Sequence, residues 1–405
     1  MHNHGPFIVL SVLFLLFGLV SKLADRSYFT APMVFMFVGA FIAYFNADLV
    51  ALHISSLEVK FIAEVTLIII LFTDASLIRF RRLKQVLVGI PGRLLGIGLP
   101  LTMLLGALSA IVLFPEFDIW LALLVALILS PTDAALGQAV IKNANVPEKI
   151  RRAIGVESGL NDGIALPPIL MAIAAVSISE SHDSNSGHWL SFMAMQLILG
   201  PLIGALIGKL GGTLVDWAAS RDWMNSTFQQ LSGVSLAILG YSCAELIGGN
   251  GFIAAFFAGL MFSSKLEILR QRSAAYGEAH SELLSLGVFF ILGVSAVPFF
   301  FPFWDVRALI YALFSLTIIR MLPVFVSLMG SDLDTYSKLF IGWFGPRGIA
   351  SVLYLLIVIT DIGVVGFEYP LSIIVLTICI SVFAHGASAT LLSNVFNRPS
   401  NKNRT

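Results

Sequence analysis

Thirteen stretches of apolar residues, separated by short polar or Gly- and Pro-containing segments, run through the sequence. Most of them approach or exceed the about 20 residues that a helix needs to cross the hydrocarbon core of a bilayer. Of all residues, 58% are apolar and 12% are charged, whereas a soluble domain carries about 25% charged residues. We therefore expect an all-α polytopic membrane protein with about thirteen transmembrane helices. The predicted spans are 6–22, 30–46, 59–79, 86–114, 118–142, 147–176, 188–219, 227–247, 251–263, 280–300, 304–329, 336–359 and 370–395.

Charge and cysteine content argue against several classes of protein. Lys and Arg together number 24, as do Asp and Glu, so no net charge would attract a nucleic acid. The two cysteines, Cys243 and Cys379, lie in apolar stretches and show no spacing typical of a zinc site or a disulfide framework. No Lys or Arg precedes the first stretch, which we expect to be a span rather than a cleaved signal. We expect no cofactor, no nucleotide and no appended soluble regulatory domain.

The positions of Lys and Arg predict the orientation of the spans. If the N-terminus lies outside, 18 of the 24 basic residues fall in segments that face the cytoplasm, and only Lys60 and Arg307 fall on the outer side. Cytoplasmic segments of membrane proteins carry such an excess of basic residues. The sequence therefore predicts an outer N-terminus, a cytoplasmic C-terminus and a multi-pass location in the cell membrane (the inner or plasma membrane).

The odd number of spans suits an inverted repeat of six helices on either side of a linker helix. The fifth and twelfth predicted spans each carry a proline beside a charge: Pro131 with Asp133 in LSPTDAALG, and Pro346 with Arg347 in WFGPRGIAS. Proline interrupts helical hydrogen bonding and frees backbone carbonyls, which need other partners in a membrane. Paired interrupted helices mark the ion sites of transporters, although Pro and Gly also kink membrane helices that have no such role.

Charged residues inside the spans cost at least about 2.5–3.5 kcal/mol each and are therefore functional candidates. In the sixth span Ser158 and Asp162 are four residues apart and share one helix face, with Glu157 and Asn161 on the neighbouring face. A hydroxyl one turn from a carboxylate supplies the oxygen ligands that Na⁺ or Li⁺ prefers. One carboxylate holds either a metal ion or a proton, and this competition is itself a basis for exchange. The other candidates are Asp74, Asp133, Arg320 and Arg347.

Two arginines in the second half, Arg320 and Arg347, need buried anions. A buried carboxylate that is paired with arginine stays charged, and we expect Glu157 to form a structural ion pair with Arg320. Arg347 is expected near the opposed ends of the two broken helices, where it and Asp133 would offset the helix dipoles. His385, in the last span, is expected to be a packed and hydrogen-bonded residue, with a pH-sensing role as the alternative.

The motifs SPTDA, ESGLNDG and GPRGIAS, in this order and at these intervals, resemble those of the NhaP-type sodium/proton antiporters, relatives of the animal sodium/proton exchangers. The resemblance covers essentially the whole chain. It implies the fold of the NhaA and NapA antiporters, in which two unwound helices cross, here the fifth and twelfth spans. It also implies a homodimer, in which each protomer has a core bundle, 86–176 and 304–395, and dimerisation or scaffold helices, 6–79 and 188–300.

The same resemblance implies roles for individual residues. Asp162 would be the carboxylate that binds the transported ion, and Asn161 marks the variants that resemble electroneutral exchangers. Asp74 stands where family members carry an acidic residue near the site. The core-stabilising ion pair of the family corresponds to Glu157 and Arg320. The remaining cation ligands would be Ser158, Asp133 and the backbone of Thr132.

The sequence therefore predicts a secondary antiporter, and not an enzyme, that exchanges Na⁺ or Li⁺ for H⁺ one-to-one by movement of the core against the scaffold. K⁺/H⁺ exchange stays open, because selectivity depends on small differences in cavity geometry. A channel or a sodium-coupled symporter of related fold is a further alternative, and it would move ions without obligatory proton counter-flow. An intramembrane protease is disfavoured because the Gly-x-Gly-Asp and Gly-x-Ser-Gly motifs do not occur.

Overall fold

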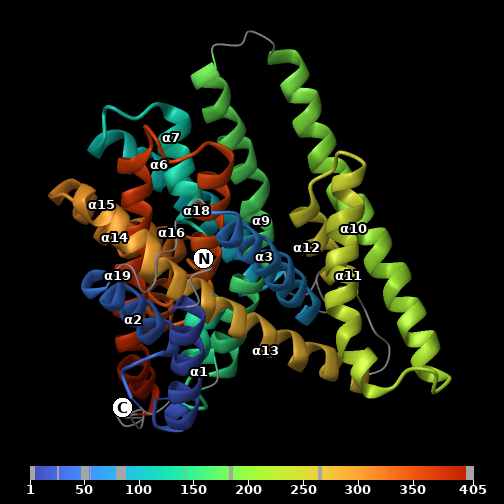
Figure 1. Ribbon diagram of the computed structural model, residues 1–405. Coiled ribbons are helices and arrows are strands. Elements are labelled where there is room, and N and C mark those ends of the chain that lie inside the picture. Colours follow the sequence, from blue (N-terminus) through green and yellow to red (C-terminus); the bar gives the residue numbers. More distant parts are fainter. Residues whose placement is uncertain are drawn as a thin grey trace.

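The computed structural model describes residues 5–24, 27–46, 54, 56–78, 88–141, 143–181, 186–262 and 267–397, which form helices and no strand (Figure 1). The basic segments 79–87 and 398–405, which contribute to the predicted orientation, lie outside the described residues. The helices are α1 (Gly5–Ala24), α2 (Ala31–Phe45), α3 (Leu57–Leu77), α5 (Ile90–Arg93), α6 (Leu99–Leu113), α7 (Ile119–Ile128), α8 (Ala134–Ile141), α9 (Glu148–Ser181), α10 (Ser186–Ser220), α11 (Ser226–Leu246), α12 (Gly251–Met261), α13 (Glu267–Ile291), α14 (Val297–Phe300), α15 (Val306–Leu316), α16 (Ile318–Ser327), α17 (Thr335–Trp343), α18 (Ile349–Asp361) and α19 (Glu368–Ser393).

Each predicted span corresponds to a helix or to consecutive helical segments, which confirms the all-α polytopic architecture. Within the described residues, seven helices are long and apolar enough, by length and composition, to cross a membrane. Others are shorter, such as α12, or interrupted. The fifth and twelfth predicted spans are interrupted as expected, into α7 and α8 and into α17 and α18.

The start of the tenth span differs from the prediction. The apolar stretch places it at residue 280, but α13 begins at Glu267. The first turns of this helix read EILRQRSAAYGEAH, and such polar turns escape a hydropathy pattern although Ala, Glu, Leu and Arg favour a helix. A helix can therefore extend beyond the apolar part of a span.

Side-chain caps fix the beginnings of several helices. At each of these starts an Asp, Asn or Ser oxygen accepts a hydrogen bond from a backbone N–H of the first turn, which otherwise has no partner within the helix. The capping residues are Ser56 for α3, Asp118 for α7, Asn225 for α11, Asn250 for α12, Asp305 for α15 and Asp334 for α17.

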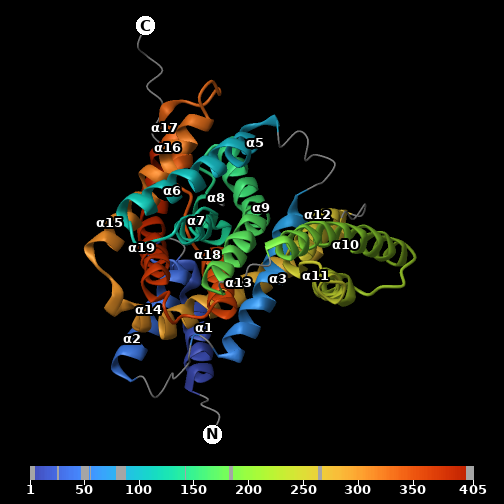
Figure 2. The same cartoon turned by 90° about the horizontal axis from the view of Figure 1, so that it is seen from above.

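The helices form two groups. In Figure 1, α10, α11 and α12 stand apart from α6, α7, α15 and α19, and Figure 2 shows the same separation from above. In the first group α12 packs against α3, α10 and α11, and α13 packs against α2, α3 and α11. In the second group α9 packs against α7 and α8, and α19 packs against α7, α8 and α15. The groups meet where α9 contacts α3 and α12 and where α18 contacts α3 and α13.

The close packing of α10 on α12 requires glycine at particular positions. A Cβ atom added at Gly204 would overlap the carbonyl oxygen of Ala254, and one added at Gly208 would overlap that of Ala258. Small residues permit this close approach of backbones in membrane helices. The two helices are therefore held at a distance that a larger residue at either position would disrupt.

We expect Gly204→Ala to lower the midpoint of thermal unfolding in detergent, because overpacking a close contact costs about 1–3 kcal/mol. The matched control is Gly18→Ala, since a Cβ atom at Gly18 in α1 meets no atom within 4 Å. Equal midpoints for the two variants would contradict the close packing of α10 on α12.

Candidate ion-binding site

Two broken helices cross in the second group of helices. α7 ends at Ile128 and α8 begins at Ala134, while α17 ends at Trp343 and α18 begins at Ile349. Each gap contains the proline that the sequence analysis singled out. The two irregular segments are joined by a hydrogen bond of 2.9 Å from the backbone N–H of Asp133 to the carbonyl of Pro346.

Opposite charges lie at the opposed helix ends of this crossing. Arg347 Nη1 donates hydrogen bonds to the carbonyls of Ser130 at 2.7 Å and Pro131 at 3.3 Å, just beyond the C-terminal end of α7. Asp133 Oδ2 accepts from the backbone N–H of Ile349 at 2.8 Å. Since α18 has no side-chain cap of its own, Asp133 caps it from the other broken helix. A cation at a helix C-terminus and an anion at an N-terminus are the favourable arrangement.

Asp162 lies on α9 beside the crossing, with 5% of its surface exposed. The hydroxyl oxygens of Thr132 and Ser158 are 3.0 Å apart, and Asn161 Nδ2 donates to Thr132 Oγ1 at 2.7 Å. These contacts hold the irregular segment after α7 against α9. Among the described residues, Asp162 Oδ1 and Asn161 Oδ1 are buried oxygens that have no hydrogen-bond partner. Buried acceptors of this kind need an ion or water, and oxygen atoms are the ligands that hard cations take.

A tyrosine that the sequence analysis did not select also contacts this site. Tyr354 Oη, in α18, donates to the backbone carbonyl of Asp162 at 2.8 Å. The residue is fully buried. A buried Tyr hydroxyl usually has a hydrogen-bond partner. Tyr354 is the one aromatic residue of α18, and this is the signal that could have identified it.

The arginine in α16 lies next to Glu157, as expected. Arg320 Nη2 is 2.7 Å from Glu157 Oε1, and the two side chains are 1% and 2% exposed. A Cβ atom at Gly345 would overlap the guanidinium of Arg320, so this glycine leaves room for the arginine beside the crossing. The ion pair thus joins α16 to α9, one turn before Asp162.

One cavity, of about 400 Å³, runs from the start of α9 to Asp74 in α3. Arg151 and Arg152 lie in its lining together with Gly159. A Cβ atom at Gly159 would be 3.6 Å from the carbonyl oxygen of Asp74, which places Asp74 one turn of α9 away from Asp162. The predicted acidic residue near the site, Asp74, therefore lines this cavity one turn of α9 away from Asp162.

A second cavity, of about 290 Å³, lies near the other end of α9 and is lined by Glu64, Glu245 and Asp361 among others. Glu64 is 3.7 Å from Lys60, and Glu245 accepts from the N–H of Gly251 at 2.7 Å. Neither side chain lines the cavity that contains Asp74.

A phenylalanine packs against the backbone of α9 directly after Asp162. Gly163 directly follows Asp162, and a Cβ atom there would overlap the ring of Phe256 in α12. The ring of Phe256 therefore lies on the backbone of α9 at this point. Sequence reasoning missed this contact because Phe256 is one of 32 phenylalanines and nothing in its motif distinguishes it.

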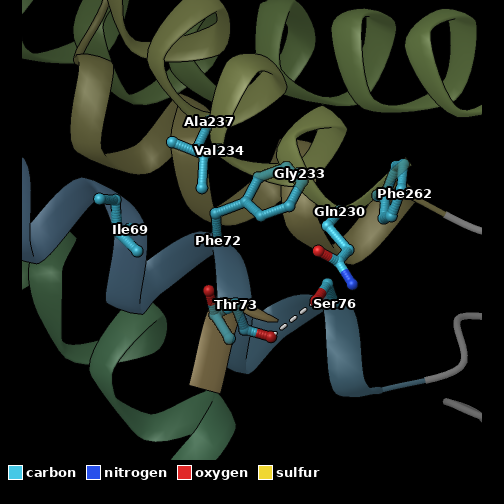
Figure 3. Close-up of a pocket in the computed structure, with 10 residues that line it drawn as sticks. Ile69, Phe72, Thr73, Ser76, Gln230, Gly233, Val234, Ala237 and Phe262 are labelled. Atoms are coloured by element: carbon cyan, nitrogen blue, oxygen red, sulfur yellow. Dashed lines mark hydrogen bonds between the residues drawn. The ribbon is translucent and has the colours of Figure 1, made fainter. Parts of the chain in front are cut away.

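A much smaller cavity lies on another face of α3 (Figure 3). Thr73, Ser76 and Gln230 contribute polar groups to it, and Phe72 and Val234 contribute apolar ones. Its volume of about 10 Å³ is close to the minimum that holds one water molecule. It has no room for a hydrated ion and is not part of the candidate site.

Removing one partner of the buried ion pair should destabilise the protein strongly. We expect Arg320→Met to cost about 3–5 kcal/mol, because it leaves the carboxylate of Glu157 buried without a counter-charge. The double variant with Glu157→Gln should recover most of the loss, since no charge is left unpaired. Thermal unfolding in detergent measures both, and a single variant that melts at the wild-type temperature would contradict a stabilising pair.

Solved structures of similar fold are known. The structure of the sodium proton antiporter MjNhaP1 from Methanocaldococcus jannaschii at pH 8 superposes with a TM-score of 0.74, covering 98% of this chain and 99% of that chain, at 19% sequence identity. A map of the same antiporter from electron microscopy gives a TM-score of 0.72. The agreement confirms the predicted fold. The two crossed and broken helices of that fold are the ones described above for this chain.

Sequence comparison identifies the family. The Na(+)/H(+) antiporter of Schizosaccharomyces pombe is 26% identical over 256 residues, which are 60% of this chain and 54% of that protein. The K(+)/H(+) antiporter NhaP2 of Shewanella sp. (strain ANA-3) is 24% identical over 278 residues, 68% of this chain and 47% of that protein. The chain thus spans about half the length of these curated relatives. The family described as "Sodium/hydrogen exchanger, transmembrane" matches residues 9–395, and the chain belongs to it.

Proposed function

We propose that this protein is a secondary antiporter, and not an enzyme, that exchanges Na⁺ or Li⁺ for H⁺ one-to-one and needs no cofactor. The observation that carries the proposal is the pair of buried, unpaired oxygens, Asp162 Oδ1 and Asn161 Oδ1, beside the crossing of two broken helices. The relative from S. pombe is named a Na(+)/H(+) antiporter, and membership of the sodium/hydrogen exchanger family supports the same activity.

In this proposal the carboxylate of Asp162 holds either the cation or the proton, and the two therefore compete. Asn161 offers its amide oxygen, and the paired hydroxyls of Thr132 and Ser158 lie within reach of the same place. Asp133 adds negative charge from the crossing. Exchange is electroneutral if Asp162 alone changes its protonation state.

The two cavities support alternating access. The first cavity is lined by Asp74 and by Arg151 and Arg152 near the start of α9, while Phe256 packs on Gly163 directly after Asp162. We propose that the core bundle, 86–176 and 304–395, moves against the scaffold helices, 6–79 and 188–300. This movement would close the first cavity and uncover the site toward the second.

We also propose that the N-terminus lies outside and the C-terminus in the cytoplasm of the cell membrane. The excess of basic residues on one side of the spans supports this orientation. It makes the cavity that reaches Asp74 the cytoplasmic one. The protein would act as a homodimer among membrane lipids. An apolar face of α10 could contact either the second protomer or lipid, and its exposed leucines are Leu202, Leu206, Leu210 and Leu214.

K⁺/H⁺ exchange is the second candidate. The relatives from Shewanella are named K(+)/H(+) antiporters, and the oxygen ligands of the site suit any of the three cations. The proteoliposome assay described next separates Na⁺/H⁺ from K⁺/H⁺ exchange.

The function is tested in proteoliposomes that contain a pH-sensitive dye. Na⁺, Li⁺ or K⁺ is added outside, first at zero membrane potential and then at a fixed potential. We expect Na⁺ and Li⁺ to drive proton movement at a rate that does not depend on the potential. Movement with K⁺ alone would favour the second candidate, and no proton movement with any cation, from folded protein, would overturn both.

Asp162→Asn should abolish exchange, because an amide cannot take up and release the proton. The control is Asp332→Asn, which neutralises a surface carboxylate that is 93% exposed and should leave the rate unchanged. Size-exclusion chromatography and thermal unfolding show whether the inactive variant is folded. Exchange near the wild-type rate in Asp162→Asn would refute the role of this carboxylate.

Competition at one carboxylate also predicts how cation affinity depends on pH. As the pH falls, the proton occupies Asp162 in a larger fraction of molecules, so the half-saturating Na⁺ concentration should rise linearly with proton concentration. Rates measured against Na⁺ concentration at several pH values test this. A half-saturating concentration that stays constant while the maximal rate falls would point to separate sites for the two ions.

A further inference from the structure

Helix α19 packs against the crossing and holds the backbone of the irregular segment between α17 and α18. The backbone N–H of Arg347 donates to Ser381 Oγ at 2.6 Å. Both residues are fully buried. This contact comes from an element outside the two broken helices, so it fixes the position of the crossing relative to the rest of the core.

A histidine one turn further along α19 contacts the same serine. His385 Nδ1 is 3.1 Å from Ser381 Oγ and 2.9 Å from the Ser381 carbonyl oxygen. In one neutral tautomer Nδ1 accepts the hydroxyl proton, and in the other it donates to the carbonyl. In both, the contact with Ser381 goes through Nδ1 and not through Nε2.

The ring of His385 is itself held by the helix that ends at the crossing. The ring of Trp343, the last residue of α17, lies 4.9 Å from that of His385, centre to centre. Trp343 Nε1 donates to Ser388 Oγ at 2.9 Å. His385 is therefore enclosed between α17 and its own helix, with 1% of its surface exposed.

The residues on both sides of Arg347 contact Asp133. Pro346 accepts from the backbone N–H of Asp133, and the N–H of Ile349 donates to the Asp133 carboxylate. A Cβ atom at Gly348 would overlap the same carboxylate, so the Asp133 side chain packs directly against the backbone of Gly348. A shift of the Arg347 backbone would therefore displace both contacts with Asp133.

We propose that Ser381 and His385 are positioning residues of the ion site. Ser381 holds the backbone of Arg347, His385 orients Ser381 through Nδ1, and Asp133 is thereby kept where it contributes to cation binding. The part that concerns cation binding rests on the proposed function. The part that concerns the backbone does not.

The test uses four variants of the full chain in proteoliposomes. Ser381→Ala removes the acceptor, His385→Gln places its amide near the position of Nε2, and His385→Asn places its amide near that of Nδ1. Thr377→Val is the matched control, since it removes a buried hydroxyl from the same helix whose hydrogen bond, of 2.7 Å, goes to the carbonyl of Ile373. The half-saturating Na⁺ concentration, the maximal rate and amide hydrogen exchange of residues 344–349 are measured for each.

We expect Ser381→Ala and His385→Gln to raise the half-saturating Na⁺ concentration about fivefold, the equilibrium effect of one lost neutral hydrogen bond. Their amides at 344–349 should exchange faster. His385→Asn should restore both quantities to within about twofold of wild type, and Thr377→Val should change neither.

Three outcomes would overturn the positioning role. They are wild-type affinity and amide exchange in Ser381→Ala, equal losses in His385→Asn and His385→Gln, and a loss in Thr377→Val as large as that in Ser381→Ala. A wild-type protein without exchange activity would instead refute the proposed function. The amide exchange of 344–349 then still decides whether Ser381 and His385 hold this segment.

Discussion

The rest of the structure depends on how charged side chains neutralise the partial charges at the ends of two broken membrane helices. A break leaves backbone groups without helical partners, and irregular backbone is tolerated at membrane depth only where protein or a water-filled cavity surrounds it. Here Arg347 donates to the carbonyls beyond α7, and Asp133 caps α18. Because these contacts fix the segment after α7, Thr132 is held beside α9 and meets the residues that precede Asp162.

Features that depend on local sequence could be predicted. The breaks follow from Pro131 and Pro346, the all-helical membrane fold follows from the apolar stretches, and the shared face of Ser158 and Asp162 follows from helical periodicity. The ion pair of Glu157 with Arg320 could also be predicted, because few anions occur inside the spans and a buried arginine requires one.

Contacts chosen by tertiary packing could not be predicted in the same way. Phe256 covers Gly163, and Tyr354 donates to the carbonyl of Asp162, although neither residue has a neighbouring motif that points to its partner. His385 was expected to be hydrogen-bonded, but its link to Arg347 through Ser381 requires knowledge of how α19 lies against the crossing. The polar first turns of α13 escaped detection because hydropathy reports burial in lipid and not helicity.

Each broken helix is capped by a residue of the other one, and the two are synthesised at different times. Ser130 and its partner Arg347 are 217 residues apart, and Asp133 and Ile349 are separated by a similar distance along the chain. The first broken helix therefore enters the membrane long before the ribosome has added the residues that satisfy its end. Until then, these carbonyls depend on water, on lipid headgroups or on the insertion machinery. The two halves become a single cooperative folding unit only when the second crossing helix arrives.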